Sequence, residues 1–337
     1  MRRNLATAGA LIVALLLFAV LVQRNTGEWI FLSLANVELV LRQTAIVGTA
    51  ALGMTLVIAA GGIDLSVGAA IALTTVVTAV AMRSGAGPVG AALLGIGAAA
   101  IGGALNGLLV TSLRVVPFIV TLGTMLAIRG AAKGLAHEER VDAPVTLLNE
   151  ALAALPPERR WQLVAPGVWL MIVLAVAGAV LLGRTRFGRH LLAVGSNEAA
   201  ARLAGIRVER VKRAVYALGG VMAGVAGVLQ FARLSVGDPT VATGLELDII
   251  AAVVIGGASL AGGEGSILGS ILGALIMTVI RAGGSQLGWS NWVQEIVTGA
   301  IIVAAVAVDR YRHRRSRRID RLTWFRGAVT LAIGRLP

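Results

Sequence analysis

The hydrophobic pattern of the 337-residue chain consists of apolar runs separated by short polar or glycine-rich stretches. Many runs approach the ~20 residues that a helix needs to cross the hydrocarbon core of a bilayer. The pattern therefore predicts an all-α, polytopic membrane protein with about ten transmembrane helices. The runs lie at 5–22, 37–60, 69–82, 88–113, 116–135, 163–182, 214–231, 249–260, 267–280 and 292–308.

Two glycine-rich stretches interrupt this pattern, GGIDLSVG at 61–68 and GGASLAGGEGS at 256–266. Glycine permits sharp reversals and close packing, so we expect broken helices at both places. Asp64 stands alone in a long apolar region. A carboxylate at mid-membrane costs roughly 2.5–3.5 kcal/mol, so such a residue is usually functional or capped. Asp64 and Ser66 either cap the following helix or serve the solute path, and the sequence leaves both alternatives open.

Three further polar residues lie within the predicted helices. Asn106 either makes an interhelical hydrogen bond or contacts the solute. Thr121 and Thr124 either face a polar path or bond carbonyls of their own helix. We therefore treat five residues as candidates for the solute path or its gate: Asp64, Ser66, Asn106, Thr121 and Thr124.

The formal net charge of +13 comes largely from basic residues at the N-terminus, in the segment 184–213 and in the tail. Because Lys and Arg resist translocation, we expect these regions and both termini on the cytoplasmic side. Orientation in a lipid bilayer, the expected partner, therefore explains the excess of positive charge, and binding to nucleic acid is not needed to explain it. We expect one membrane domain over 1–310 and a basic cytoplasmic tail over 311–337, whose end favours an interfacial helix over another span.

The segment 184–213 carries eight basic residues between two apolar regions. Within it, SNEAAARLAG predicts a short helix that Ser196 or Asn197 caps and Gly205 ends. A folded helix on a basic loop is a docking surface more readily than a connector, although an ordinary anchoring loop remains the alternative. The candidate docking residues are Gly195, Ser196, Asn197, Glu198, Ala199, Arg202 and Gly205.

Several kinds of chemistry have no support in the sequence. It has no cysteine and only three scattered histidines, so we expect neither a disulfide nor a metal site. No phosphate-binding GxxxxGK(S/T) motif occurs, so this chain is expected to bind no nucleotide cofactor, and we expect no catalytic residues. Spans lined by Gly, Ala, Ser, Thr and Asn suit an uncharged solute with hydroxyl groups and offer few groups to a coupling ion.

Four blocks of sequence, in the same order, closely resemble the permease subunits of ABC importers for monosaccharides, the branched-chain-amino-acid and ribose type of permease. The resemblance extends from about residue 36 to residue 310. The blocks are IAAGGIDLSVGA (58–69), PFIVTLGTMLAIRG (117–130), RTRFGRHLLAVGSNEAAARLAGI (184–206) and AAVVIGGASLAGGEGSILGSILGAL (251–275).

This resemblance implies a non-catalytic permease subunit in the bacterial inner membrane. The expected partners are a cytoplasmic ABC ATPase that uses ATP and Mg²⁺, an extracytoplasmic sugar-binding protein and a second permease copy, identical or paralogous. The segment 184–213 would be the cytoplasmic coupling loop that docks on the ATPase, and we name it the coupling segment. The solute would be a monosaccharide or related polyol, which the sequence does not specify further. The alternative from another class is a stand-alone, ion-coupled secondary transporter of a small polar solute.

Overall fold

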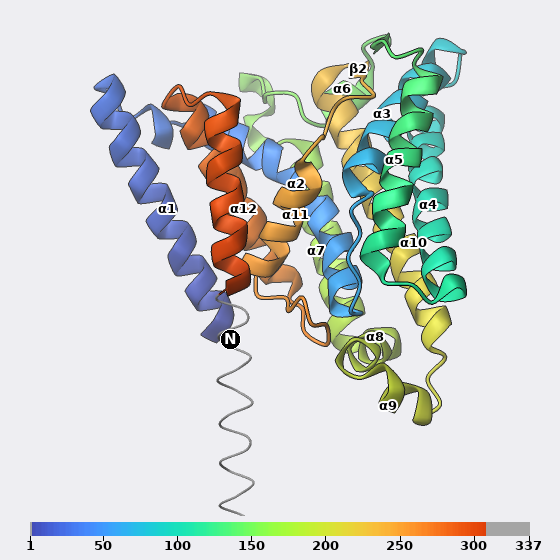
Figure 1. Cartoon of the computed structure of the whole chain (residues 1–337). Helices are drawn as coiled ribbons and strands as arrows, with labels where there is room; N and C mark the ends of the chain where they lie inside the picture. Colours follow the sequence, from blue (N-terminus) through green and yellow to red (C-terminus); the bar gives the residue numbers. More distant parts are fainter. Residues whose placement is uncertain (1, 308–337) are drawn as a thin grey trace, which may run out of the picture.

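The computed structural model describes residues 2–307, which are almost entirely helical (Figure 1). Among the described residues, each expected apolar run lies mostly in a helix, and the prediction of an all-α, polytopic membrane protein is confirmed. Among the described residues, seven helices are long and apolar enough to cross a membrane. The helices that contain the runs are α1 (Arg2–Thr26), α2 (Leu34–Ala59), α3 (Val67–Arg83), α4 (Pro88–Leu113), α5 (Pro117–Leu135), α7 (Pro166–Arg184), α10 (Val208–Leu234), α11 (Leu245–Ile255), α12 (Ile267–Gln286) and a last helix, Asn291–Ala307.

The remaining elements are short and lie at the two ends of the bundle. The basic tail at 311–337, with its expected interfacial helix, lies outside the described residues. The short elements are the 3-10 turns η1 (Ile30–Leu32) and η2 (Pro157–Gln162), the helices α6 (Leu147–Glu150), α8 (Arg186–Ser196) and α9 (Glu198–Leu203), and the strands β1 (Val141–Asp142) and β2 (Val236–Gly237). The two strands form one antiparallel pair, with Val141 opposite Gly237 and Asp142 opposite Val236.

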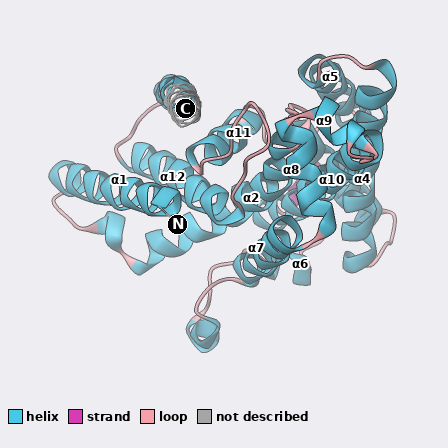
Figure 2. Cartoon of the chain, turned by 90° about the horizontal axis from the view of Figure 1, so that it is seen from below, coloured by secondary structure: helices cyan, strands magenta, loops and turns pink. Residues whose placement is uncertain are grey.

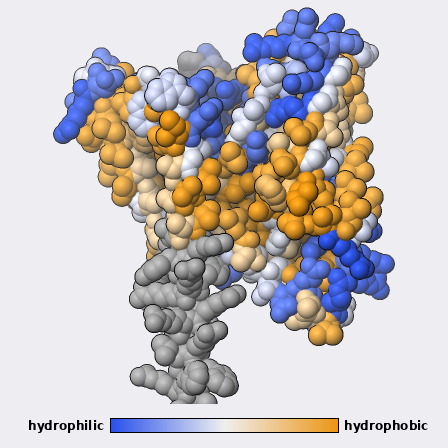
Figure 3. Space-filling model, viewed as in Figure 1, coloured by the Kyte–Doolittle hydropathy of each residue, from blue (hydrophilic) through white to orange (hydrophobic). Residues whose placement is uncertain are grey.

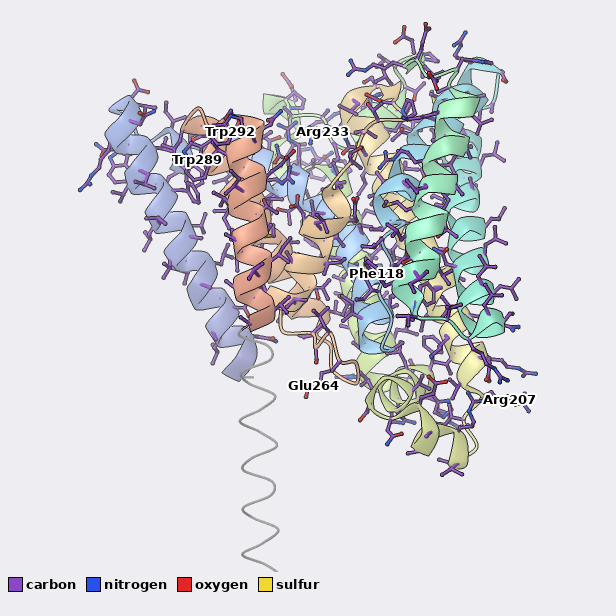
Figure 4. The ribbon with its side chains drawn as sticks, in the orientation of Figure 1. Phe118, Arg207, Arg233, Glu264, Trp289 and Trp292 are labelled. Atoms are coloured by element: carbon purple, nitrogen blue, oxygen red, sulfur yellow. The ribbon has the colours of Figure 1, made fainter. Side chains whose placement is uncertain are left out.

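On the face shown in Figure 3, a hydrophobic band crosses the middle of the molecule and separates two hydrophilic ends. Arg207 and Glu264 lie at one end, together with the beginning of α1, α8 and α9 (Figures 1 and 4). Arg233, Trp289 and Trp292 lie at the other end (Figure 4). We call these ends the coupling face and the opposite face. The coupling segment and the second glycine-rich break share one face (Figure 4).

Close backbone contact between α4 and α10 forms the centre of the bundle. A Cβ atom on Gly103 would lie 2.4 Å from the carbonyl oxygen of Tyr216, and one on Gly220 would lie 2.5 Å from that of Ala99. A Cβ atom on Gly107 would lie 2.8 Å from the facing backbone, and one on Gly224 would lie 2.7 Å from it. Small residues drive this kind of association because lipid provides no hydrophobic force between helices.

Threonine hydroxyls in the buried helices bond mainly to carbonyls one turn earlier. Thr44 and Thr55 on α2 donate to Val40 and Ala51, at 2.7 and 2.6 Å. The same two hydroxyls also contact α12, Thr44 at Thr278 and Thr55 at Ser270. These bonds satisfy the hydroxyls away from water and join α2 to α12.

Helix α11 differs in position from the expected run at 249–260, since it begins at Leu245 and ends at Ile255. Glu246 and Asp248, which precede the expected run, therefore lie in its first turn. Asp248 is only 1% exposed, and its carboxylate pairs with Arg281 on α12. This pairing explains how a carboxylate is accommodated inside the bundle. At 11 residues, α11 rises about 16 Å, roughly half of a bilayer core.

Candidate functional site

Three of the five path candidates meet in one buried cluster. Asp64 and Ser66 come from the break between α2 and α3, and Asn106 comes from α4. The Asp64 Oδ1 atom accepts hydrogen bonds from the backbone N and hydroxyl of Ser66, at 2.9 and 2.6 Å. The Asn106 amide donates to the Ser66 hydroxyl at 2.8 Å and lies 3.4 Å from Asp64 Oδ1. We call Asp64, Ser66 and Asn106 the polar cluster.

The cluster changes the capping expectation. Ser66 occupies the N-cap position of α3, but its side chain makes no capping bond to the helix. Asp64 bonds the amide of Ser66 itself, which precedes the helix, and not an amide within the first turn. Capping of α3 by these two side chains, one of the two alternatives that the sequence left open, is therefore not observed. The physical reason is that Ser66 keeps helical backbone angles, so its hydroxyl turns toward Asp64 and Asn106 instead.

Two side chains with hydroxyl groups, Thr121 and Tyr216, contact the backbone of the break between α2 and α3. Thr121 on α5 donates to the carbonyl oxygen of Ile63 at 3.2 Å, and the Tyr216 hydroxyl on α10 lies 3.4 Å from that oxygen. Thr124 bonds the Thr121 carbonyl within its own helix, so it is not part of the cluster. Sequence reasoning missed Tyr216. Its signal was a phenol within a glycine-rich apolar run, where a buried hydroxyl needs a partner.

One acceptor in the cluster is vacant. The Asn106 Oδ1 atom is buried and has no hydrogen-bond partner among the described residues, although the side chain is fully enclosed. A buried carbonyl group without a donor costs free energy, about 1–3 kcal/mol. The cluster can therefore accept one more hydroxyl or amide donor.

The coupling segment folds into two helices where one was expected. Asn197 caps α9, since its side chain accepts from the Ala200 amide at 3.0 Å. Gly205 follows the end of α9 with φ of +80°, which only glycine adopts without cost. Ser196 does not cap α9, because it is the last residue of α8. We missed α8, whose signal is the apolar spacing of Phe187, Leu191 and Val194 among basic residues.

Figures 1 and 2 show α8 and α9 below the bundle, next to the start of α10. Most residues from 196 to 205 are exposed, including the candidates Glu198, Ala199 and Arg202. Leu203 at the end of α9 is 92% exposed, and no local signal in the sequence distinguishes it. An exposed leucine on a short, charged helix offers apolar area that a partner protein can bury.

Ion pairs hold α9 against the start of α10. Glu198 contacts Lys212 at 2.6 Å and Arg202 at 3.2 Å, and Arg202 also contacts Glu209 at 2.6 Å. The hydrogen bond from Lys212 lowers the pKa of the Glu198 carboxyl. A cavity of about 330 Å³ lies beside this network, between α9 and the turn at Arg114. Linked pairs of this kind fix the orientation of a short helix better than isolated ones.

Gly195 lies on the other side of the coupling segment, toward the bundle. A Cβ atom there would lie 1.9 Å from the carbonyl oxygen of Ala59 and 2.6 Å from the amide nitrogen of Gly263. Gly195 therefore contacts both helix breaks directly. Within the set of candidate docking residues, Gly195 faces inward, whereas Glu198, Ala199 and Arg202 face solvent.

Comparisons with known proteins identify the family of the chain. Residues 36–306 match the family described as "Branched-chain amino acid transport system / permease component". The chain is 41% identical over 300 residues to the ribose import permease protein RbsC of Escherichia coli (strain K12), a match that covers 88% of this chain and 92% of that protein. It is 43% identical over 281 residues to the Bacillus subtilis (strain 168) protein of the same name. This match covers 83% of this chain and 86% of that protein.

A third relative is the xylose transport system permease protein XylH of Escherichia coli (strain K12). It is 34% identical over 368 residues, covering 91% of this chain and 92% of the relative. No solved structure matches the chain. With seven helices of spanning length among the described residues, the chain is a membrane protein. It belongs to the branched-chain amino acid transport system / permease component family, whose members are non-catalytic permease subunits that work with an ABC ATPase and a binding protein.

Proposed function

We propose that this chain forms the membrane path for a monosaccharide or related polyol in an ATP-driven importer. The observation that carries the proposal is α9, a self-capped helix that stands outside the bundle and exposes Leu203 beside an ion-pair network. A chain without a nucleotide site needs a rigid element through which an ATPase can move it. The helix α9 has the position and the exposed surface for that contact.

The polar cluster supports the solute class. Its donors and acceptors are those that bind sugar hydroxyls, and Asn106 leaves one buried acceptor vacant. Relatives named for ribose and xylose import support the same class. We assign Asp64, Ser66, Asn106 and Thr121 to the path or its gate. Thr124 bonds its own helix in this conformation and would join the path only if α5 turned.

The arrangement of the complex follows from the two faces. The ATPase, which uses ATP and Mg²⁺, docks at the coupling face, and the sugar-binding protein docks at the opposite face. This chain itself holds no cofactor. A second permease, identical or paralogous, completes the path in the inner membrane. The coupling face, both termini and the tail at 311–337 are then cytoplasmic, as the basic residues favour.

Reconstitution with partners tests the proposal. The chain is purified with its candidate ATPase and binding protein and placed in liposomes, and radiolabelled ribose, xylose and other monosaccharides are offered with ATP. We expect uptake only with ATP, the ATPase and the loaded binding protein. Uptake driven by a proton or sodium gradient without the ATPase would contradict the proposal and favour a secondary transporter.

Orientation is tested by single cysteines, because the natural sequence contains none. Cysteines in place of the exposed residues Thr243 and Ser290 should react with a membrane-impermeant maleimide in intact cells. A cysteine at the exposed Ala200 should react only after the membrane is opened. Labelling of Ala200→Cys in intact cells would place the coupling face outside and exclude contact with a cytoplasmic ATPase.

A further inference from the structure

Three segments that are far apart in the sequence meet at the end of α8. They are the end of α2 with the first break, the end of α8, and the second break between α11 and α12. Each segment contributes glycine where it meets the others. We call Ala59, Gly61, Gly195, Gly262 and Gly263 the glycine junction.

The backbones in the glycine junction touch without intervening side chains. The Cβ contacts of Gly195, at 1.9 and 2.6 Å, are far below the 3.0 Å that real Cβ atoms respect. A Cβ atom on Gly262 would lie 2.6 Å from the Gly195 carbonyl oxygen and 2.9 Å from the Gly61 Cα atom. The packing therefore leaves no space for even one methyl group at these positions.

A hydrogen bond joins the two breaks across this contact. The Gly263 amide donates to the carbonyl oxygen of Ala59 at 2.9 Å, so the end of α2 is bonded to the second break. Gly61, Gly262 and Gly263 all have positive φ, between +79° and +83°. Glycine adopts this conformation without the cost that other residues bear, which keeps each turn tight enough to approach the others.

The start of α10 provides a second connection from the coupling segment to the first break. Tyr216 lies two turns into α10, and its hydroxyl contacts the Ile63 carbonyl. The same hydroxyl occupies the position that a side chain on Gly62 would need. Ion pairs from α9 to α10 hold this end of the helix. The coupling segment thus contacts the first break at Gly195 and, through Tyr216, at Ile63.

We propose that the glycine junction and the coupling segment move as one rigid body, so that a displacement of α9 shifts both helix breaks together. This inference rests on the proposed function, in which the ATPase moves α9. Gly195 is a positioning residue, because it transmits the displacement by backbone contact without touching either the ATPase or the solute. The first break carries Asp64 and Ser66, so the movement directly reaches their hydrogen bonds with Asn106 on α4.

A cross-link tests whether the two breaks move together. A Cβ atom on Gly265 would lie 3.1 Å from the Cβ atom of Ala59, and Gly265 has no positive φ. In the cysteine-free chain, A59C and G265C should therefore form a disulfide on oxidation with little adjustment. We expect the oxidised double variant in the complete complex to retain ATP-driven sugar uptake at about the rate of its reduced form. Loss of uptake on oxidation, with recovery on reduction, would show that the breaks separate during transport and would overturn the proposal.

Gly195→Ala tests the transmission from the coupling segment. We expect the variant complex to keep its ATPase, because the docking surface of α9 is unchanged. Uptake should fall about tenfold or more, since a methyl group at this site forces packed backbones apart, and the loaded binding protein should no longer stimulate ATP hydrolysis. The matched control is Gly183→Ala, in the last turn of α7 near the coupling segment, where a Cβ atom meets nothing within 4 Å. This control should transport normally.

The outcomes separate the two proposals. Wild-type uptake by Gly195→Ala would overturn the junction proposal and leave the proposed function intact. If Gly195→Ala fails to assemble at all, the cross-linked variant still decides whether the breaks move as one body. If the wild-type chain neither retains an ATPase nor requires ATP for uptake, the proposed function fails instead.

Discussion

The two glycine-rich breaks look alike in sequence but are held in different ways. The first break is mostly buried, and side chains from α4, α5 and α10 bond its backbone and its polar residues. The second break lies partly exposed at the coupling face, and backbone bonds close it on itself, such as that from Gly262 to Ser259 at 2.9 Å. A glycine-rich break can therefore provide either a site for chemistry or a shape for packing.

This difference has a consequence for solute binding. Side-chain hydrogen bonds in the first break can be exchanged for bonds to a sugar hydroxyl, because hydroxyl and amide groups rotate and have more than one partner. Backbone bonds in the second break, such as that from Ala258 to Val253, have no such freedom. We therefore expect the first break to respond to the solute and the second to respond to movement of the coupling segment.

The largest expected effect is at Asp64. In Asp64→Leu the buried Ser66 amide and the Asn106 side chain lose an acceptor, and each such loss costs about 1–3 kcal/mol. We expect a total of about 3 kcal/mol, seen as a clear fall in the melting temperature of the purified protein in detergent. Asp64→Asn keeps an oxygen acceptor and should lose about 1 kcal/mol or less. Equal melting temperatures for the two variants would show that the hydrogen bonds of the polar cluster do not hold the first break.

An intermediate effect is expected where α11 packs on α12 beside the second break. A Cβ atom on Gly273 would lie 1.9 Å from the carbonyl oxygen of Ala252. Gly273→Ala should therefore destabilise the protein by about 2 kcal/mol, within the range for overpacked sites. The control is Gly97→Ala on α4, where a Cβ atom meets nothing within 4 Å and alanine favours the helix. If both variants melt at the same temperature, backbone packing does not define the second break.

The smallest effect is expected at Thr121. Thr121→Val removes a hydroxyl that contacts the first break at the Ile63 carbonyl, at a net cost of about 1 kcal/mol. Thr124→Val removes a bond within α5 only, so it serves as the control. We expect the affinity for sugar, measured from the concentration dependence of uptake, to change in Thr121→Val and not in Thr124→Val. A change in both would assign the effect to α5 as a whole.

Local signals in the sequence predicted much of the fold and part of the candidate site. Most of each apolar run became a helix, because apolar residues in lipid have few other ways to satisfy their backbone. The Asn197 side chain can cap the start of a helix, and the Gly205 backbone can adopt the positive φ that follows a helix end. Both residues occupy these positions around α9 in the structure. Ser196, like Asn197, has a side chain that can cap a helix, yet Ser196 belongs to the preceding helix α8. Composition alone could therefore not show which of the two residues caps α9.

Contacts between distant residues were not predictable in this way. Asp64 and Asn106 were each unusual in an apolar span, but only the packing of α4 beside the first break brings them together. The expected run at 249–260 began just after Asp248, because the sequence does not show that Arg281 on α12 pairs with this carboxylate. Gly195 carried no local signal at all for its contact with Ala59, since that contact depends on the meeting of three separate segments.

The close contact between α4 and α10 also has a consequence for biosynthesis. Gly103 and Gly107 on α4 and Gly220 and Gly224 on α10 each lie against the backbone of the facing helix, where a larger side chain would clash. Because α10 leaves the ribosome well after α4, the glycine face of α4 must contact lipid or another temporary neighbour until α10 enters the bilayer. Assembly of this chain thus has an order, in which the earlier helices insert first and reach their final packing only when α10 arrives.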